Sequence, residues 1–132
     1  MKHIGVGVGA FILNEHNELL LVRRKKEPEA AHWSLQGGKV ELMETIEDAT
    51  VREIKEELGV TIELKRLLCV TNHILPPATH FVAPTFVAHI TEGNVTNREP
   101  HASSEVGYFA LTQLPTPLTV TTLNALKEFK HD

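Results

Sequence analysis

Three glutamates in one short stretch of this sequence could do chemistry together. Glu53, Glu56 and Glu57 fall close together and directly follow Arg52. On a helix, at about 100° per residue, all three carboxylates lie within about 100° of one another and can converge on one ion. A solvated helix face is the competing interpretation, because clustered charges on helices usually face water. The spacing by itself leaves both interpretations open.

A glycine pair upstream of the glutamates favours a metal site. Gly37 and Gly38 lead into the carboxylate-rich segment, and a turn at this pair would place backbone carbonyl oxygens beside the carboxylates. Mg²⁺ prefers octahedral oxygen ligation, keeps several waters and is commonly completed by substrate phosphates. The segment therefore predicts an oxygen-lined site for a divalent cation and a substrate that carries a diphosphate.

The segment that contains the glutamates is predicted to be a helix over residues 46–58. Thr45, followed three positions later by Asp48, forms an approximate N-cap pattern, and Gly59 is a typical C-terminal stop. Apolar residues at helical spacing would share the neighbouring arc and face the core. The core would therefore hold this helix along one side while its carboxylates face a site.

Strands are predicted on both sides of this helix. We expect residues 4–13 and 18–24 to form a hairpin, because both runs have β-type patterns and the NEHN between them supplies turn residues. Residues 25–36 are polar, meet the glycine pair and are predicted to form a loop. Further strands are expected at residues 63–74, 81–90 and 105–114.

Prolines shape the last third of the predicted fold. Pro84 would place part of its strand at a sheet edge or a bulge, because proline lacks the N–H that a central strand needs. After Pro115 and Pro117, the spacing of apolar residues predicts a closing amphipathic helix. Its apolar positions are Val120, Leu123, Leu126 and Phe129.

The composition is that of one ordinary globular domain, which we expect to span residues 1–132. The chain is 42% hydrophobic and 23% charged, so neither a disordered nor a fibrous architecture is indicated. A net charge of −4, with RRKK at residues 23–26 as the basic cluster, argues against a broad grip on nucleic-acid polymers. Cys69 is the single cysteine, which fits a reducing compartment and the cytoplasm. No apolar run approaches the roughly 20 residues of a membrane span.

A complete family motif surrounds the glutamates. From Gly38, five residues lead to Glu44 and seven more to Arg52-Glu53-Ile54, and Glu56-Glu57 is followed by Gly59-Val60. This resembles the Nudix box, G-x5-E-x7-R-E-U-x-E-E-x-G-U with U a bulky aliphatic residue, at every fixed position. The similarity extends over nearly all of the chain.

Two positions depart from the commoner form of the motif. Gln36 stands where many family members carry proline, and Met43 stands where glycine usually precedes the glutamate. Both departures concern the stiffness of the loop more than the charge that a metal would meet. They therefore weaken inferences about the shape of the loop, and hence about the substrate.

The resemblance implies a fold and a site. The fold would be α/β, an α/β/α sandwich around a central mixed β-sheet, with the box holding Mg²⁺ or Mn²⁺. Glu56 and Glu57 would be metal ligands, Glu53 a further ligand or base, and the carbonyl of Gly38 a ligand. Arg52 would orient these carboxylates by hydrogen-bonded ion pairing.

The implied chemistry is in-line attack of water on phosphorus, with cations neutralising charge on the phosphoryl oxygens. In this family the general base is a box glutamate or a carboxylate from a later loop. Glu105, just before the strand that contains VGYF, is the candidate from a later loop, and a solvated loop charge is the alternative.

Three further residues are candidates for substrate binding. Arg23 ends a predicted strand close to the site, where a guanidinium could grip phosphate through two hydrogen bonds. His73 could face the substrate, although surface or packing roles are commoner for histidines. Phe81 could stack on a base, although core or rim packing is the commoner role of a lone aromatic.

The stretches 70–90 and 97–115 more loosely resemble small pyrophosphohydrolases that act on nucleoside triphosphates, including oxidised purine and pterin forms. This similarity implies a small nucleotide substrate and release of pyrophosphate. ADP-ribose or another nucleoside-diphosphate sugar is the rival substrate. Two alternatives are not enzymes. One is a nucleotide sensor that does not hydrolyse its ligand, and the other is a purely structural domain, a function that leaves the complete box unexplained. A homodimer is left open, because no residue pattern establishes the oligomer.

Overall fold

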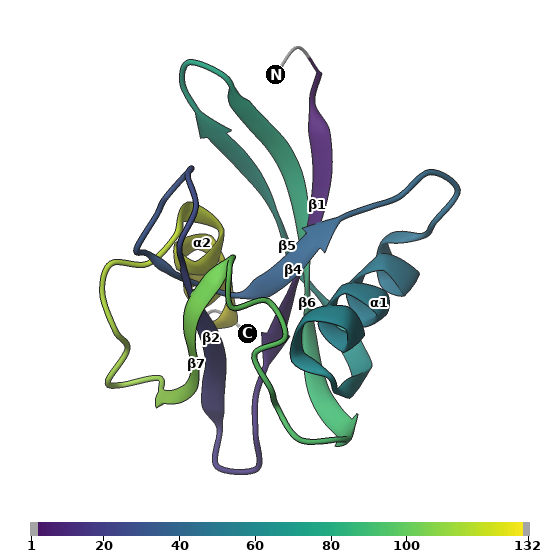
Figure 1. Ribbon diagram of the computed structural model, residues 1–132, viewed down its shortest axis with the longest axis vertical. Coiled ribbons are helices and arrows are strands. Elements are labelled where there is room, and N and C mark those ends of the chain that lie inside the picture. Colours follow the sequence, from purple (N-terminus) through teal and green to yellow (C-terminus); the bar gives the residue numbers. More distant parts are fainter. Residues whose placement is uncertain (1–2, 131–132) are drawn as a thin grey trace.

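Seven strands and two helices form between residues 3 and 130, the part of the chain described by the computed structural model (Figure 1). In chain order they are β1 (Gly5–Ile12), β2 (Glu18–Arg24), β3 (Trp33–Ser34), β4 (Gln36–Lys39), α1 (Ile46–Leu58), β5 (Thr61–Leu75), β6 (Thr79–Glu92), β7 (Ser103–Ala110) and α2 (Val120–Lys130). Neither helix, at 13 and 11 residues, is long and apolar enough to cross a membrane.

The strands form two sheets, where the sequence predicted one central sheet. The larger sheet has the order β4-β1-β6-β5, and it is mixed because β1 runs parallel to β6 while the other pairs are antiparallel. The smaller sheet has the order β3-β2-β7. The predicted α/β class and the mixed sheet are confirmed, and the second sheet was not expected.

The predicted hairpin between β1 and β2 is wrong as a pairing, although the turn between them exists. The side chain of Asn14 accepts hydrogen bonds from the N–H groups of His16 and Glu18, which closes the turn. The two strands then share only the isolated bridge between Leu13 and Leu19. The reason is that β4 and β6 occupy both edges of β1, and β2 pairs along its length with β7.

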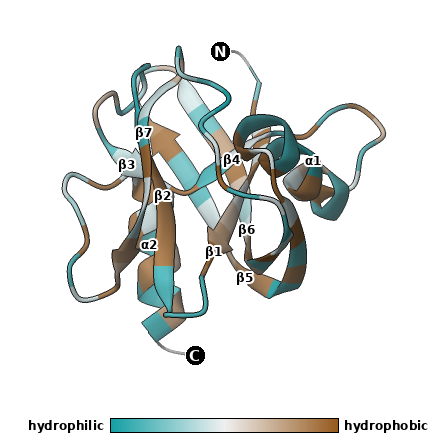
Figure 2. Ribbon diagram, turned by 60° about the horizontal axis from the view of Figure 1, so that its bottom comes forward, coloured by the Kyte–Doolittle hydropathy of each residue, from teal (hydrophilic) through white to brown (hydrophobic). Residues whose placement is uncertain are grey.

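Alternate side chains of β1 pack in two different hydrophobic clusters, one beside each helix. Ala10 and Ile12 belong to the hydrophobic cluster that includes Ile54 and Leu58 of α1. Phe11, between them, belongs to the cluster of α2. Successive side chains of a strand point to opposite faces, so one strand supplies both cores. The two helices consequently cover opposite sides of the strands, as Figure 1 shows, and Figure 2 shows the hydrophobic colour along β2.

Helix α1 begins and ends where the sequence predicted. The Oγ1 of Thr45 accepts a hydrogen bond of 3.0 Å from the N–H of Asp48, which satisfies one of the free donors of the first turn. Gly59 has a φ of 73°, and its N–H donates to the carbonyl of Lys55. This left-handed cap favours glycine because a side chain there is strained.

The glycine pair lies in a strand and not in the predicted turn. Gly37 and Gly38 belong to β4 and pair antiparallel with Gly9 and Val8 of β1. A Cβ on Gly37 would overlap the carbonyl of Val8, and a Cβ on Gly38 would overlap the carboxylate of Glu53. Gly37 therefore needs glycine because the backbone of β1 approaches it closely, whereas a side chain at position 38 would displace the carboxylate of Glu53.

Pro84 lies in a central strand with no shift of register around it, in contrast to the predicted edge or bulge. Strand β6 lies between β1 and β5, and its pairing with β1 is interrupted between Val82 and Thr85, around the proline. The missing N–H is thus accommodated by a gap in the ladder and not by an edge. Gly7 and Val8 of β1 lie opposite this gap.

The predicted strand near residue 105 and the closing helix are both present, but the buried face of α2 is turned from the expected one. Leu126 is buried and Phe129 stacks on Phe11, whereas Leu123 is 54% exposed. Thr122 takes a buried position because its hydroxyl accepts a hydrogen bond from the N–H of Leu35. A buried polar contact therefore sets the helix face that apolar spacing alone misplaced.

We predict that Gly37→Ala lowers the midpoint of thermal unfolding by roughly 5 °C or more, because the added Cβ overlaps the Val8 backbone. Gly7→Ala is the matched control on the neighbouring strand, where the nearest atom to a new Cβ is 3.6 Å away. It should shift the midpoint by less than about 2 °C. Equal shifts in both variants, measured by circular dichroism, would contradict the close approach.

Candidate functional site

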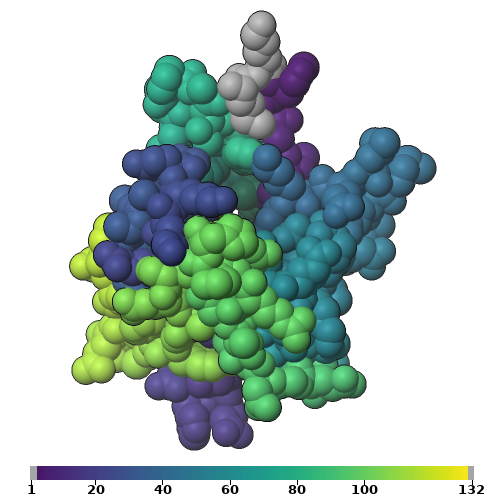
Figure 3. Space-filling view, viewed as in Figure 1, coloured from purple at the N-terminus to yellow at the C-terminus, as the bar shows by residue number. Residues whose placement is uncertain are grey.

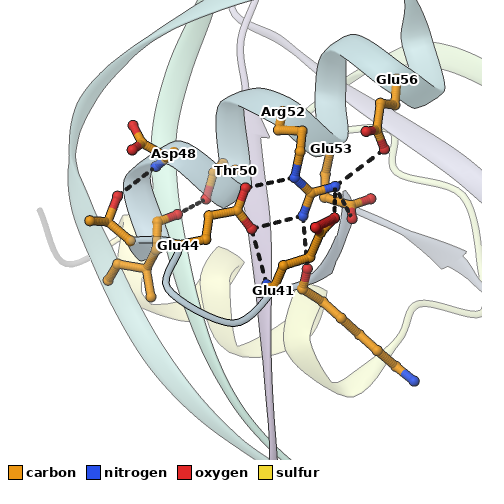
Figure 4. A network of polar contacts seen from close by, with 10 residues as sticks. Glu41, Glu44, Asp48, Thr50, Arg52, Glu53 and Glu56 are labelled. Atoms are coloured by element: carbon orange, nitrogen blue, oxygen red, sulfur yellow. Dashed lines mark hydrogen bonds and ion pairs between the residues drawn. The ribbon is translucent and has the colours of Figure 1, made fainter.

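The guanidinium of Arg52 lies at the centre of the acidic segment (Figure 4). Its Nε and Nη2 donate to the two carboxylate oxygens of Glu44, at 2.6 and 2.9 Å. Nη2 also donates to the carbonyl of Lys39 at 3.1 Å, which ties α1 to the end of β4. The bond from Arg52 lowers the pKa of Glu44 to about 2, and the same bond raises the pKa of Arg52. This pair therefore stays charged at neutral pH.

The third nitrogen of Arg52, Nη1, meets three more carboxylates. It lies 2.9 Å from Glu53, 3.2 Å from Glu56 and 3.3 Å from Glu41. The side chain of Glu53 is only 12% exposed, whereas that of Glu56 is 56% exposed. The predicted cluster is thus divided, because Glu53 points inward while Glu56 stays at the surface beside the guanidinium.

Glu53 and Glu57 form a close pair of carboxyl groups on the buried side of α1. The pKa of Glu57 is raised to about 8, first by burial and then by the carboxyl of Glu53, with which it shares a hydrogen bond. Its other oxygen, Oε2, is buried without a hydrogen-bond partner among the described residues. Gly38 lies against the carboxylate of Glu53. A buried oxygen without a donor has the chemistry of a cation ligand.

These residues fit one kind of metal better than another. Among residues 3–130, no three His, Cys, Asp or Glu side chains are gathered where they could together hold an ion. A closed zinc site is therefore a poor fit. The Glu53 and Glu57 pair fits Mg²⁺ or Mn²⁺, since hard cations take one or two carboxylates and complete the shell with water and phosphate oxygens.

The later-loop carboxylate that acts on Glu57 is Glu99 and not Glu105. The loop before β7 docks on the end of α1, where the N–H groups of Thr96 and Arg98 donate to the carbonyls of Leu58 and Glu57. The charge of Glu99, the next residue, contributes to the raised pKa of Glu57.

Glu105 lies elsewhere. Its side chain is exposed on β7, where it is opposite Arg23 of β2. Nothing in the sequence separates the two loop carboxylates, because the docking contacts that place Glu99 are made by backbone groups.

A cavity of about 630 Å³ adjoins the carboxylate pair. Figure 3 shows a recess between the dark blue segment that follows β2 and the lighter blue segment of the acidic helix. Glu57, Gly38 and Lys39 lie on its wall together with two of the predicted substrate residues, His73 and Phe81. This volume is within the usual range for sites that bind small molecules.

His73 and Phe81 are direct partners in the pairing of β5 with β6, so the two rings come from neighbouring strands. The Nζ of Lys39 lies 5.9 Å from the centre of the Phe81 ring. Arg23 does not line the cavity, whereas Arg24 does. Successive side chains of a strand point to opposite faces, so a prediction that is wrong by one residue names a side chain on the wrong face.

Several residues on this site were not expected from the sequence. Glu41 stands at no fixed position of the motif. Glu44 stands at a fixed position, but its ion pair with Arg52 was not predicted. Glu29 and Thr119, on the cavity wall, lie far apart in the chain and share no pattern.

The sequence matches the NUDIX domain family over residues 3–129. The chain belongs to the Nudix family. Its Nudix box therefore comprises the end of β4, α1 and the loop between them.

Several Nudix proteins are similar to this chain. An ADP-ribose pyrophosphatase of Methanocaldococcus jannaschii is 35% identical over 105 residues, which cover 79% of this chain and 61% of that protein. The human 8-oxo-dGDP phosphatase NUDT18 is 37% identical over 119 residues, which cover 89% of this chain and 36% of that protein. The chain thus spans less than two thirds of the length of these relatives.

A solved structure is more similar still in sequence. The crystal structure of a MutT NUDIX hydrolase from Burkholderia pseudomallei is 45% identical, with a TM-score of 0.88, and the match covers 96% of this chain and 98% of that one. The Nudix fold of this chain is therefore supported over almost its whole length. The names of these similar proteins differ in substrate.

We predict that Arg52→Lys lowers the midpoint of thermal unfolding by several degrees, because an ammonium cannot hold both oxygens of Glu44 and reach Glu53 as well. Lys65→Ala is the control, since it removes an exposed ion pair with Glu63. It should shift the midpoint by less than about 1 °C. Similar small shifts in both variants would show that Arg52 does not organise the site.

A second prediction concerns pH in the presence of EDTA. Glu57 has a pKa of about 8 in the folded protein, whereas the ordinary value for a glutamate is 4.5, so the folded state keeps a proton that the unfolded state has lost. Stability from this group is therefore present below pH 4.5 and is lost as pH rises toward 8. Glu57→Gln should remove this loss. The unfolding midpoint of the variant, relative to that of the wild type, should therefore increase as pH rises.

The control is Glu105→Gln, which removes an exposed carboxylate from β7. Its difference from the wild type should stay constant across the same pH range. A constant difference for Glu57→Gln as well, in scanning calorimetry between pH 5 and 8, would refute the buried-proton interpretation.

Proposed function

We propose that this Nudix protein is a divalent-metal-dependent pyrophosphohydrolase that cleaves a phosphoric anhydride bond of a small nucleotide. The observation that carries the proposal is the pair of Glu53 and Glu57, with one buried oxygen lacking a donor, beside a cavity of about 630 Å³. Family membership supports the same reaction. The complete Arg52 network also favours an enzyme over a nucleotide sensor, because a sensor has no need to hold so many carboxylates in place.

The carboxylates and Arg52 have different proposed roles. Glu53 and Glu57, with the carbonyl of Gly38, are the proposed metal ligands, and Arg52 orients Glu53. For Glu56 to join them, as the motif implies, its carboxylate must turn inward from its surface position beside Arg52. When bound, Mg²⁺ or Mn²⁺ neutralises charge on phosphoryl oxygens and lowers the pKa of water.

Glu99 is the proposed later-loop base, in place of Glu105, because its charge contributes to the raised pKa of Glu57. The box glutamates are the alternative. Either carboxylate would take the proton of the water that attacks phosphorus in line.

The proposed substrate is a nucleoside triphosphate, such as an oxidised purine or pterin form, with pyrophosphate and a monophosphate as products. The 45% identity to a MutT NUDIX hydrolase supports this substrate. The similarity to an archaeal ADP-ribose pyrophosphatase favours ADP-ribose as the second candidate. His73 and Phe81 line the cavity and are the proposed contacts of the base. Arg24, which lines the cavity while its Nε and Nη2 donate to the carbonyls of Pro28 and Lys26, is the proposed phosphate contact in place of Arg23.

The test is a panel of nucleoside triphosphates, ADP-ribose and nucleotide sugars with Mg²⁺, in which phosphate and pyrophosphate are detected separately. We expect pyrophosphate and a monophosphate, and no turnover in EDTA. Glu57→Gln should lower kcat by about 100-fold or more, because it removes one of two paired carboxylates. Glu105→Gln is the matched control and should retain activity.

Other outcomes have distinct meanings. If AMP and ribose 5-phosphate are the products, the substrate is ADP-ribose and not a nucleoside triphosphate. If nucleotides of the panel bind tightly and none is hydrolysed, the protein is a nucleotide sensor and not an enzyme.

A further inference from the structure

Glu29 joins three distant parts of the chain at the cavity wall. It lies in the segment between β2 and β3 with a φ of 62°, a left-handed conformation that non-glycine residues seldom adopt. Its side chain is only 10% exposed. Oε2 accepts a hydrogen bond of 2.8 Å from the N–H of Val120, the first residue of α2. A strained backbone and a buried carboxylate together indicate a position with a specific task.

The contact with α2 is a helix cap supplied from another segment. Helix α2 has no acidic residue in its own first turn. The carboxylate of Glu29 provides the negative charge that the positive end of a helix favours. One of its oxygens is thus occupied by a structural role, which fixes where the other oxygen lies.

The other oxygen, Oε1, faces His73 of β5. It lies 3.0 Å from Nε2 of the imidazole, which is buried, although the angle of approach is outside that of a directed hydrogen bond. The side chain of His73 is 14% exposed and lines the cavity. Because Nε2 is buried, the exposed part is the remainder of the side chain.

A carboxylate beside Nε2 favours the tautomer with the proton on that nitrogen. In the neutral ring, Nδ1 is then a hydrogen-bond acceptor. Phe81 is the direct cross-strand partner of His73 and also lines the cavity. A flat heterocycle that packs on Phe81 would therefore place its edge beside an acceptor on His73.

We propose that Glu29 is a positioning residue that keeps His73 as a hydrogen-bond acceptor for a ring N–H of the substrate base. The inference rests on the proposed function, because it assigns one end of the cavity to the nucleoside. Guanine has such a ring N–H, and adenine has none on its six-membered ring. The pair of Glu29 and His73 consequently selects guanine over adenine.

Glu29→Gln is the informative variant. The amide oxygen can still accept from Val120, so the cap of α2 is kept. The amide NH₂ group, however, is presented to Nε2 of His73, which moves the ring proton to Nδ1 and removes the acceptor. His73→Phe removes the acceptor outright and keeps a ring of similar size. Glu27→Gln is the control, since it also removes a carboxylate from this loop, where Glu27 accepts from the N–H of Ala30.

The experiment measures Kd for guanosine monophosphate, adenosine monophosphate and inorganic tripolyphosphate by calorimetry with Mg²⁺. We expect the wild type to prefer the guanine nucleotide by about tenfold, the worth of one hydrogen bond to a charge-oriented group. Glu29→Gln and His73→Phe should lose this preference, whereas Glu27→Gln should keep it. Tripolyphosphate affinity should change by less than about twofold in all variants, because it has no base.

Two results for the monophosphates would overturn the inference, and a third concerns tripolyphosphate. One is a wild type without preference between the two monophosphates, and the other is a preference that survives in both Glu29→Gln and His73→Phe. Equal weakening of tripolyphosphate would also overturn it, because a distorted cavity and not a lost acceptor would then explain the effect. The proposed reaction stands apart from these outcomes, since it fails only if the wild type hydrolyses no member of the substrate panel.

Discussion

The site depends on one guanidinium that is surrounded by carboxylates. Without Arg52, the acidic side chains of α1 and of the loop before it would repel one another and turn toward water. Its planar donors instead hold Glu44 through two bonds and Glu53 through a third. Burial and the neighbouring carboxyl of Glu53 raise the pKa of Glu57 to about 8, so the pair carries one negative charge and one proton at neutral pH. The arrangement thus leaves negative charge in one place, toward the cavity.

Backbone contacts bring the other parts of the site to this charge. Gly37 lets β4 pass closely beside β1, and Gly38 leaves room for the carboxylate of Glu53. The loop before β7 is held by the last carbonyls of α1, which have no partner within the helix. The charge of Glu99 therefore acts on Glu57 because its loop docks where the helix ends. The loop before β7 thus meets α1 through backbone groups, which leave no signal in the sequence.

This distinction explains what the sequence could predict. Helix α1 was predicted to the residue, because its caps and its apolar period are local. The sheets were not, because neither the separation of β1 from β2 nor the central place of β6 is encoded in a strand's own pattern. The same limit applies to the site. The carboxylates of one helix could be identified together, whereas Glu99 and Glu29 depend on long-range pairing that no spacing reveals.

The interruption at Pro84 gives the cavity a further property. Gly7 and Val8, which lie opposite the gap in the ladder, also line the cavity, as does Ala83 of β6. The floor of the site is consequently a seam between two strands with fewer cross-strand bonds than the rest of the sheet. A nucleotide lying over that seam would bridge both strands, so occupancy would stiffen the sheet and slow amide exchange there.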